Sequence, residues 1–294
     1  MDSTAKTRYL RPLDVQHGRV DLSHGSGGRA MAQLIEQMFV RAFENDWLRQ
    51  GNDGACFPLP PGRIVMATDS HVVSPLFFPG GDIGCLSVHG TINDVAMAGA
   101  QPLYLSASFI LEEGFPLRDL QRIVGSMAHA AREADVAIVT GDTKVVEQGK
   151  GDGVFITTTG LGVVPEGVQV AGDRARPGDA ILLSGPVGDH GVAIMSLRAN
   201  LGFTTSLRSD TASLHRMVAE ILAVAGDIHC LRDPTRGGVA TTLNEIARQS
   251  GVGMRLDEAA LPVRAEVAAA CELLGLDPLY VANEGKLVAI VPEA

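Results

Sequence analysis

The sequence has too few basic residues for a protein that binds nucleic acid. It contains 24 Lys and Arg against 34 Asp and Glu, which gives a formal net charge of −10. Proteins that bind DNA or RNA usually carry a basic excess or a basic face. No uncharged apolar run approaches the ~20 residues that a membrane-spanning helix requires. We therefore expect neither nucleic acid nor a membrane among its partners.

Signs of export and of cysteine chemistry are also missing. Residues 1–14 contain no apolar stretch of the kind that a secretory signal needs. The four cysteines, Cys56, Cys85, Cys230 and Cys271, form no C-x-x-C motif. We interpret them as buried or unreactive thiols in a cytoplasmic protein.

Helix-like and strand-like patterns alternate along the 294 residues, which predicts an α/β or α+β fold in two domains. Residues 165–179 are rich in Pro and Gly and are the best candidate boundary, so we expect domains over residues 1–168 and 169–294. The expected helices are 31–43, 83–98, 117–131, 189–199, 214–223, 239–249 and 263–274. The expected strands are 63–68, 103–111, 136–140, 154–164, 180–183, 253–256 and, with an interruption, 280–291.

Glycine is abundant, with 34 residues, and it gathers beside polar residues. The loop His24-Gly25-Ser26-Gly27-Gly28-Arg29 directly precedes the first expected helix. Glycines let backbone N–H groups approach an anion, and a helix N-terminus favours negative charge. The loop is therefore either a phosphate contact or a flexible entry to the helix. It is not a P-loop, because the sequence contains no G-x-x-x-x-G-K-S/T.

Three aspartates lie where ligands bind in α/β proteins. Asp69 and Asp142 each follow an expected strand, and Asp94 lies on the polar stripe of an expected helix. Several carboxylates together suit a hard cation such as Mg²⁺. With Lys144 near Asp142, the set indicates a metal–nucleotide site, although each aspartate alone also fits a surface or helix-cap position.

Two later motifs place polar residues in apolar surroundings. The segment Asp233-Pro234-Thr235-Arg236-Gly237-Gly238 leads into an expected helix, which Asp233 or Thr235 either caps or extends into a site. The segment Ala282-Asn283-Glu284-Gly285-Lys286 interrupts an apolar strand and is either a bulge or a functional loop.

In this order, the motifs resemble the HypE family of hydrogenase maturation proteins, within the PurM-like ATP-binding superfamily. The glycine loop and the aspartate motifs are shared across the superfamily. Two strings are more particular to HypE: Phe77-Phe78-Pro79-Gly80-Gly81 and Gly141-Asp142-Thr143-Lys144-Val145-Val146. The resemblance runs from about Asp21 to the end of the sequence.

The resemblance implies a PurM-like fold of two α/β domains, with N-terminal sheets that pair in a homodimer and with ATP in the cleft between the domains. Residues from every motif are then expected to bind the cofactors ATP and Mg²⁺. The cofactor-binding set is Gly25, Ser26, Gly27, Gly28, Asp69, Asp94, Asp142, Thr143, Lys144, Asp233, Asn283 and Glu284. The metal-binding set is Asp69, Asp94, Asp142 and Asp233. The catalytic set is Glu284, Asp94 and Lys144.

The resemblance also implies an ATP-dependent carbamoyl dehydratase, a lyase. A HypF-like carbamoyltransferase places a carbamoyl group on a C-terminal cysteine, and dehydration of that group to a thiocyanate supplies the cyanide ligands of the NiFe hydrogenase iron. A complex of HypC-like and HypD-like proteins is the expected iron scaffold. Glu284 is the leading candidate for the base, with a metal-binding role as its alternative.

One departure from the family pattern concerns the acceptor cysteine. In the family it ends a mobile tail, whereas this sequence ends Val291-Pro292-Glu293-Ala294 and places Cys271 in an expected helix. We therefore expect the last segment of the second domain and its cysteine to be missing. Two alternatives stay open: a nucleotide-binding maturation partner without catalysis, and another PurM-like ATP-using enzyme.

Overall fold

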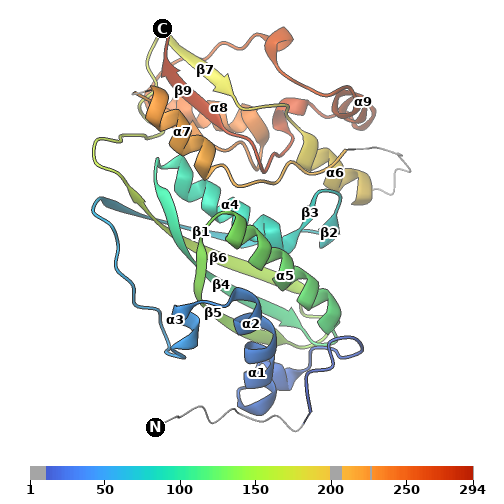
Figure 1. The fold of residues 1–294 in the computed structure, drawn as a ribbon. Coiled ribbons are helices and arrows are strands. Elements are labelled where there is room, and N and C mark those ends of the chain that lie inside the picture. Colours follow the sequence, from blue (N-terminus) through green and yellow to red (C-terminus); the bar gives the residue numbers. More distant parts are fainter. Residues whose placement is uncertain (1–10, 199–206, 226, 294) are drawn as a thin grey trace.

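A four-stranded sheet in the order β1-β6-β4-β5 forms the centre of the N-terminal domain (Figure 1). The computed structural model describes residues 11–198, 207–225 and 227–293. β4 and β5 run parallel, and the other neighbours are antiparallel. The strands of this domain are β1 (Arg63–His71), β4 (Gln101–Glu112), β5 (Ala137–Val146) and β6 (Val154–Val164), with the small hairpin β2 (Phe77–Phe78) and β3 (Gly81–Asp82).

Helices cover one face of this sheet. α4 packs against β1 and β6, and α5 packs against α4 and β5. Asp82 begins α4 by accepting hydrogen bonds from the N–H groups of Gly84 and Cys85, and α5 buries the apolar side of an amphipathic sequence. The helical elements of this domain are η1 (Leu22–His24), α1 (Gly28–Leu34), the π-helical η2 (Ile35–Val40), α2 (Arg41–Phe43), α3 (Asp46–Arg49), α4 (Ile83–Met97) and α5 (Leu117–Glu133).

The opposite face of the sheet is open. Side chains alternate between the two faces of a strand, and this alternation places Ile64 and Met66 of β1 on the open face. They are 61% and 70% exposed. Thr68 of the same strand shares a hydroxyl–hydroxyl hydrogen bond of 2.9 Å with Thr159 of β6. Exposed apolar side chains on a sheet face are typical of an interface.

The C-terminal domain has an antiparallel sheet in the order β7-β9-β8. β9 is buried on both sides, because Val288 and Ile290 pack with α8 while Ala289 packs with α7. Ala96 and Met97 at the end of α4 join the α7 side of this core, so the two domains share packed surface. The elements of the C-terminal domain are β7 (Asp179–Leu183), α6 (Asp189–Arg198), α7 (His215–Ala225), β8 (Cys230–Arg232), α8 (Gly238–Ser250), η3 (Glu258–Ala260), α9 (Ala265–Leu274), η4 (Pro278–Tyr280) and β9 (Val288–Pro292).

The expected mixed α/β architecture is confirmed, but several expected boundaries were wrong. β1 continues to His71 and β5 to Val146, because each pairs with a neighbour along its length, so Asp69 and Asp142 lie inside strands rather than after them.

The C-terminal domain also differs from the prediction. Residues 253–256 form no strand, since no described strand pairs with them. β8 was not expected, and the interrupted strand at 280–291 consists of the end of η4, a loop and most of β9. Ala199, the last residue of an expected helix, lies outside the described residues. None of the helices in the described ranges has the length and apolarity of a membrane span.

Candidate active site

Four carboxylates from four separate segments line one cleft between the two domains. Asp69 lies on β1, Asp94 on α4, Asp233 in the turn after β8, and Glu284 in the loop before β9. We call these four residues the carboxylate cluster. The cleft has a volume of about 960 Å³. The cleft also contains imidazole and guanidinium groups to which the sequence analysis assigned no role: His71, His190, Arg198, Arg232 and Arg236.

Members of the carboxylate cluster raise one another's pKa. Burial raises the pKa of Asp94 to about 7, and the charges of Asp233 and Asp69 add to the effect. Burial also raises the pKa of Asp233 to about 6, with a further contribution from Asp69. Burial raises the pKa of Glu284 to about 8, and the charges of Asp233, of nearby Asp210 and, to a smaller extent, of Asp69 and Asp94 add to the effect. A cation in the cleft would relieve this repulsion.

A buried amide joins two members of the cluster. Asn93, which precedes Asp94, donates from Nδ2 to the carbonyl oxygens of Ala212 (3.0 Å) and Glu284 (3.2 Å). Its Oδ1 accepts from the N–H of Leu214 at 2.8 Å. The only sequence signal for this role is the place of Asn93 in an otherwise apolar stretch of helix beside Asp94.

Asn283, an expected cofactor contact, connects two of the segments that line the cleft. Its Oδ1 accepts from the Gly188 N–H at 2.8 Å. Its Nδ2 donates to the carbonyl oxygens of Pro234 (2.9 Å) and Val281 (3.1 Å). The amide therefore ties the turn that carries Asp233 to the loop that carries Glu284, and its polar atoms are already engaged.

The glycine loop lies elsewhere, against the edge strand β5. Gly25 packs so closely there that a Cβ atom would lie 2.6 Å from the Val145 nitrogen. Gly27 and Gly28 have φ angles of 84° and 82°, a region that strongly favours glycine. Ser26, between Gly25 and Gly27, is exposed just before α1.

Asp142, Thr143 and Lys144 lie on β5 beside this loop. The Lys144 ammonium is 2.9 Å from Asp142 Oδ2, and its hydrogen bond lowers the pKa of Asp142. The Thr143 N–H also donates to Asp142, at 2.8 Å, while the Thr143 side chain is buried. We call residues 25–28 together with residues 142–144 the glycine-loop patch.

Within one chain, the carboxylate cluster and the glycine-loop patch do not meet. β1 and β5 are the two edges of the sheet, three strand spacings or roughly 14 Å apart. The register aligns Asp142 with Ser70, the residue after Asp69. Because side chains alternate, Asp142 points to the open face, whereas Asp69 points to the face that α4 covers.

Comparison with known proteins identifies the family. Two family models match, AIR synthase related protein, N-terminal domain, over residues 51–164, and AIR synthase related protein, C-terminal domain, over residues 176–294. The carbamoyl dehydratase HypE of Cupriavidus necator is 72% identical over 295 residues, which covers 100% of this chain and 84% of that protein. The chain belongs to the HypE family.

Solved HypE structures share the fold described above. A hydrogenase maturation protein HypE in complex with ATP superposes with a TM-score of 0.90 at 57% identity, covering 92% of this chain and 81% of that one. A HypE–HypF complex superposes with a TM-score of 0.77 at 53% identity, covering 88% of this chain and 84% of that one. The resemblance to HypE and to the PurM-like fold, expected from the motifs, is confirmed.

Proposed function

We propose that this HypE-family chain is an ATP-dependent carbamoyl dehydratase that converts a cysteine S-carboxamide into a thiocyanate. The observation that carries the proposal is the carboxylate cluster, whose raised pKa values indicate a site for a cation and its anionic ligand. The named activity of the Cupriavidus necator relative and the ATP complex of a HypE protein support it. We expect the reaction to take place in the cytoplasm, where ATP is available.

The proposed reaction removes one water from the carboxamide. Its carbonyl oxygen takes a phosphoryl group from ATP, because a phosphate leaves far more readily than an oxide. A base removes the two N–H protons, the C–O bond breaks, and the oxygen departs on phosphate. The sulfur is then bonded to a nitrile carbon, as the thiocyanate.

Glu284 is the proposed base. Asp94, as a ligand of Mg²⁺, and Lys144 are proposed to stabilise the charge that develops on the phosphates during phosphoryl transfer. With a pKa of about 8, the Glu284 carboxyl holds a proton tightly when it takes one. A positioned base of this kind contributes on the order of 10²–10⁴-fold to a rate. Positive charge in the cleft would lower this pKa and prepare the carboxylate form.

The residues of the cleft fit a Mg²⁺ ion that is held jointly by protein carboxylates and by the phosphates of ATP. In the described ranges, no three His, Cys, Asp or Glu side chains are spaced to enclose a metal ion. Mg²⁺ is commonly held by one or two carboxylates, phosphate oxygens and water. Asp69, Asp94 and Asp233 would supply the carboxylates. When bound, the ion would neutralise charge that develops on the phosphates.

Two further groups are suited to the phosphates. Arg236 is exposed at the cleft and makes no hydrogen bond or ion pair with any described residue. It is followed by Gly237 and Gly238, where α8 begins without a side-chain cap and presents the positive end of its dipole. The Gly238 N–H itself donates to the Thr235 carbonyl oxygen at 3.0 Å.

We also propose a homodimer formed through the open sheet face, which carries exposed Ile64 and Met66. In this arrangement, the glycine-loop patch of one copy completes the cleft of the other. Such pairing would explain why the carboxylate cluster and the glycine-loop patch, which the resemblance assigns to one ATP site, lie apart within a single chain.

The proposed partners follow from the same chemistry. A HypF-like carbamoyltransferase would supply the carbamoyl group, and the HypE–HypF complex of a relative supports this partner. An iron scaffold of HypC-like and HypD-like proteins would receive the cyanide.

A direct assay tests the proposal. The purified chain is incubated with MgATP and a peptide that ends in S-carbamoyl cysteine, and mass spectrometry follows the peptide. We expect the loss of one water and the appearance of a nitrile infrared band, only with ATP. Analysis of the nucleotide products then distinguishes ADP from AMP. ATP binding without any dehydrated peptide would support the non-catalytic partner instead.

A further inference from the structure

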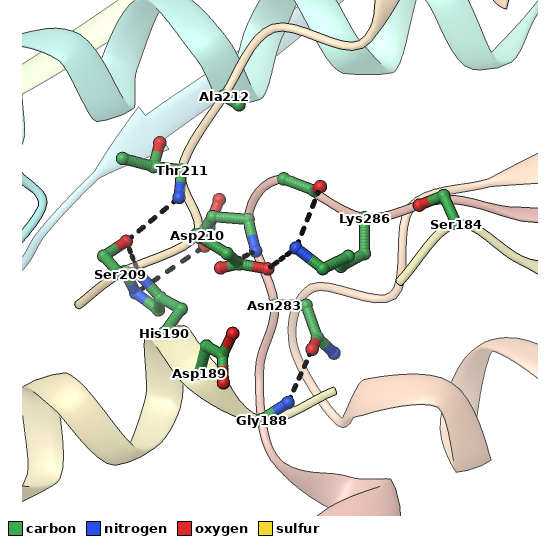
Figure 2. A network of polar contacts seen from close by, with 12 residues as sticks. Ser184, Gly188, Asp189, His190, Ser209, Asp210, Thr211, Ala212, Asn283 and Lys286 are labelled. Carbon is green, nitrogen blue, oxygen red and sulfur yellow. Dashed lines mark hydrogen bonds and ion pairs between the residues drawn. The ribbon is translucent and has the colours of Figure 1, made fainter. Parts of the chain in front are cut away.

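Residues 207–214, which precede α7, lie between the domains and form hydrogen bonds with both of them. We call this segment the strap. On the N-terminal side, the Ser209 N–H donates to the Pro79 carbonyl at 2.7 Å, and the Thr211 hydroxyl is 3.0 Å from His89 Nδ1. On the other side, Ser209 contacts His190 of α6, and Asp210 accepts a hydrogen bond from the loop that carries Glu284 (Figure 2).

Asp210 holds the main chain of that loop. Its side chain is 4% exposed, and its Oδ1 accepts from the Glu284 N–H at 3.1 Å. Its Oδ2 lies 3.1 Å from the Lys286 ammonium. Between these contacts, a Cβ on Gly285 would overlap the Asp210 carbonyl oxygen. Three consecutive residues of the loop are therefore fitted around one buried aspartate.

Ser209 holds an imidazole ring against the Glu284 carboxyl. Its Oγ lies 2.8 Å from His190 Nδ1 and accepts from the Thr211 N–H at 3.1 Å. The other ring nitrogen, Nε2, lies 3.9 Å from Glu284 Oε1. The ring is buried edge-on against Phe78, with ring centroids 5.7 Å apart.

The His190 ring is neutral in this setting. Burial lowers its pKa to about 4, against a smaller opposing effect of Asp210. A neutral imidazole has one donor nitrogen and one acceptor nitrogen, and the partner of one sets the role of the other. Ser209 therefore influences whether His190 turns an N–H or a lone pair toward Glu284, across a separation of 3.9 Å that is a contact and not a hydrogen bond.

We propose that Ser209 and Asp210 are positioning residues for Glu284: Asp210 fixes its main chain, and Ser209, through His190, orients its carboxyl. This inference rests on the proposed role of Glu284 as the base. Asp210 itself is buried beneath the loop, so its effect on the reaction passes through Glu284. A purely structural role for the strap would instead change stability alone.

Variants at His190 and Ser209 separate these two roles. In the peptide assay, we expect His190→Ala and Ser209→Ala to lower kcat by about 10–100-fold, the range typical of residues that orient a functional group. ATP affinity, measured by calorimetry, should change by less than about twofold, since neither residue is assigned to ATP. His190→Gln carries an amide that reaches the Nε2 position, so it should recover most of the lost rate.

The chain offers a matched control in the same domain. His229 is buried and lies 2.7 Å from Asp179, away from the cleft. His229→Gln and Asp179→Asn should lower thermal stability while kcat is kept. Asp210→Asn should lower both thermal stability and kcat, because it leaves the Lys286 ammonium without its ion pair.

A spectroscopic readout tests the positioning without turnover. In ¹⁵N-labelled protein, the ring nitrogens of His190 should show one tautomer in the wild type and a mixture in Ser209→Ala. Lack of turnover by the wild type would overturn the proposed function, and the ring spectra would still test the positioning. Unchanged kcat in active protein, or identical His190 spectra in both forms, would overturn this inference.

Discussion

Asn93 Nδ2 donates to the main-chain oxygen of Glu284 at 3.2 Å, so the helix that carries Asp94 is bonded directly to the loop that carries the proposed base. Asn93 is fully buried and uses both ends of its amide. Asn93→Asp would place an acceptor against two carbonyl oxygens, and we expect it to lower the free energy of unfolding by about 2–4 kcal/mol. Urea unfolding measures this change.

Asn244→Asp is the matched control for that variant. The Asn244 amide donates to a single carbonyl oxygen within α8, at an exposed position. Asn244→Asp should therefore lower the free energy of unfolding much less than Asn93→Asp does. Equal losses at the two positions would contradict a special role for Asn93 in joining the domains.

Removal of one charge from the carboxylate cluster should weaken the binding of MgATP. We expect Asp94→Asn to reduce the affinity at least about tenfold, the equivalent of one lost charge-assisted contact. Calorimetry with and without Mg²⁺ measures the effect, which should be large only with the ion. Asp119→Asn, at a half-buried position in the first turn of α5 and outside the cleft, serves as the control. Wild-type affinity in Asp94→Asn would contradict the proposed Mg²⁺ site.

The raised pKa values predict that stability falls as pH rises. Asp94, Asp233 and Glu284 have ordinary values of 3.8, 3.8 and 4.5 and folded values of about 7, 6 and 8. Between these limits the folded state binds more protons than the unfolded state. The free energy of unfolding contributed by these groups therefore declines from about pH 4 to about pH 8.

Glu284→Gln should flatten that decline. Near pH 4 the variant and the wild type should be equally stable, because the carboxyl is protonated in both states of the wild type. At pH 8 the variant should be more stable on the order of 1–3 kcal/mol, seen as a rise of a few degrees in Tm. Thermal unfolding across this pH range measures the difference, and parallel profiles would contradict the assignment.

Gly285 tests the fit of the loop to the strap. Gly285→Ala places a methyl group into the Asp210 carbonyl oxygen, so the loop must shift. We expect loss of most dehydratase activity, on the order of 10²-fold for a displaced catalytic group. Gly251→Ala is a useful control for glycine replacement, because a Cβ there meets nothing within 4 Å, although its φ of 67° brings some strain. Full activity in Gly285→Ala would show that the Glu284 position is not critical.

Mixing two inactive variants tests whether the site is shared between copies. Asp94→Asn removes a residue of the carboxylate cluster, and Lys144→Ala removes one of the glycine-loop patch. If the two groups meet across a dimer, random pairing restores about a quarter of the sites. Activity of the mixture, after subunit exchange, measures this recovery. No recovery in a mixture shown to contain mixed dimers would mean that both groups act within one chain.

Local patterns were enough to predict much of the fold. The apolar spacing of α5 is readable because helix formation depends on residues three or four positions apart. Strand ends were predicted less well. Pairing with β4 decides that β5 continues through Asp142. Residues 253–256 form no strand, because none of the described strands pairs with them.

The sequence by itself determined the α/β class, the family and the residue types of the site, because these are carried by short motifs whose members are neighbours in the chain. Only the tertiary structure decided which motifs share a cleft. Strand order and register place Asp142 on the open face, across the sheet from Asp69. The tertiary structure also revealed the residues that hold the Glu284 main chain, since Asn93 lies 191 positions away from Glu284 in the sequence and Asp210 lies 74 positions away. Contacts over such separations arise from packing of the whole chain, which no local spacing encodes.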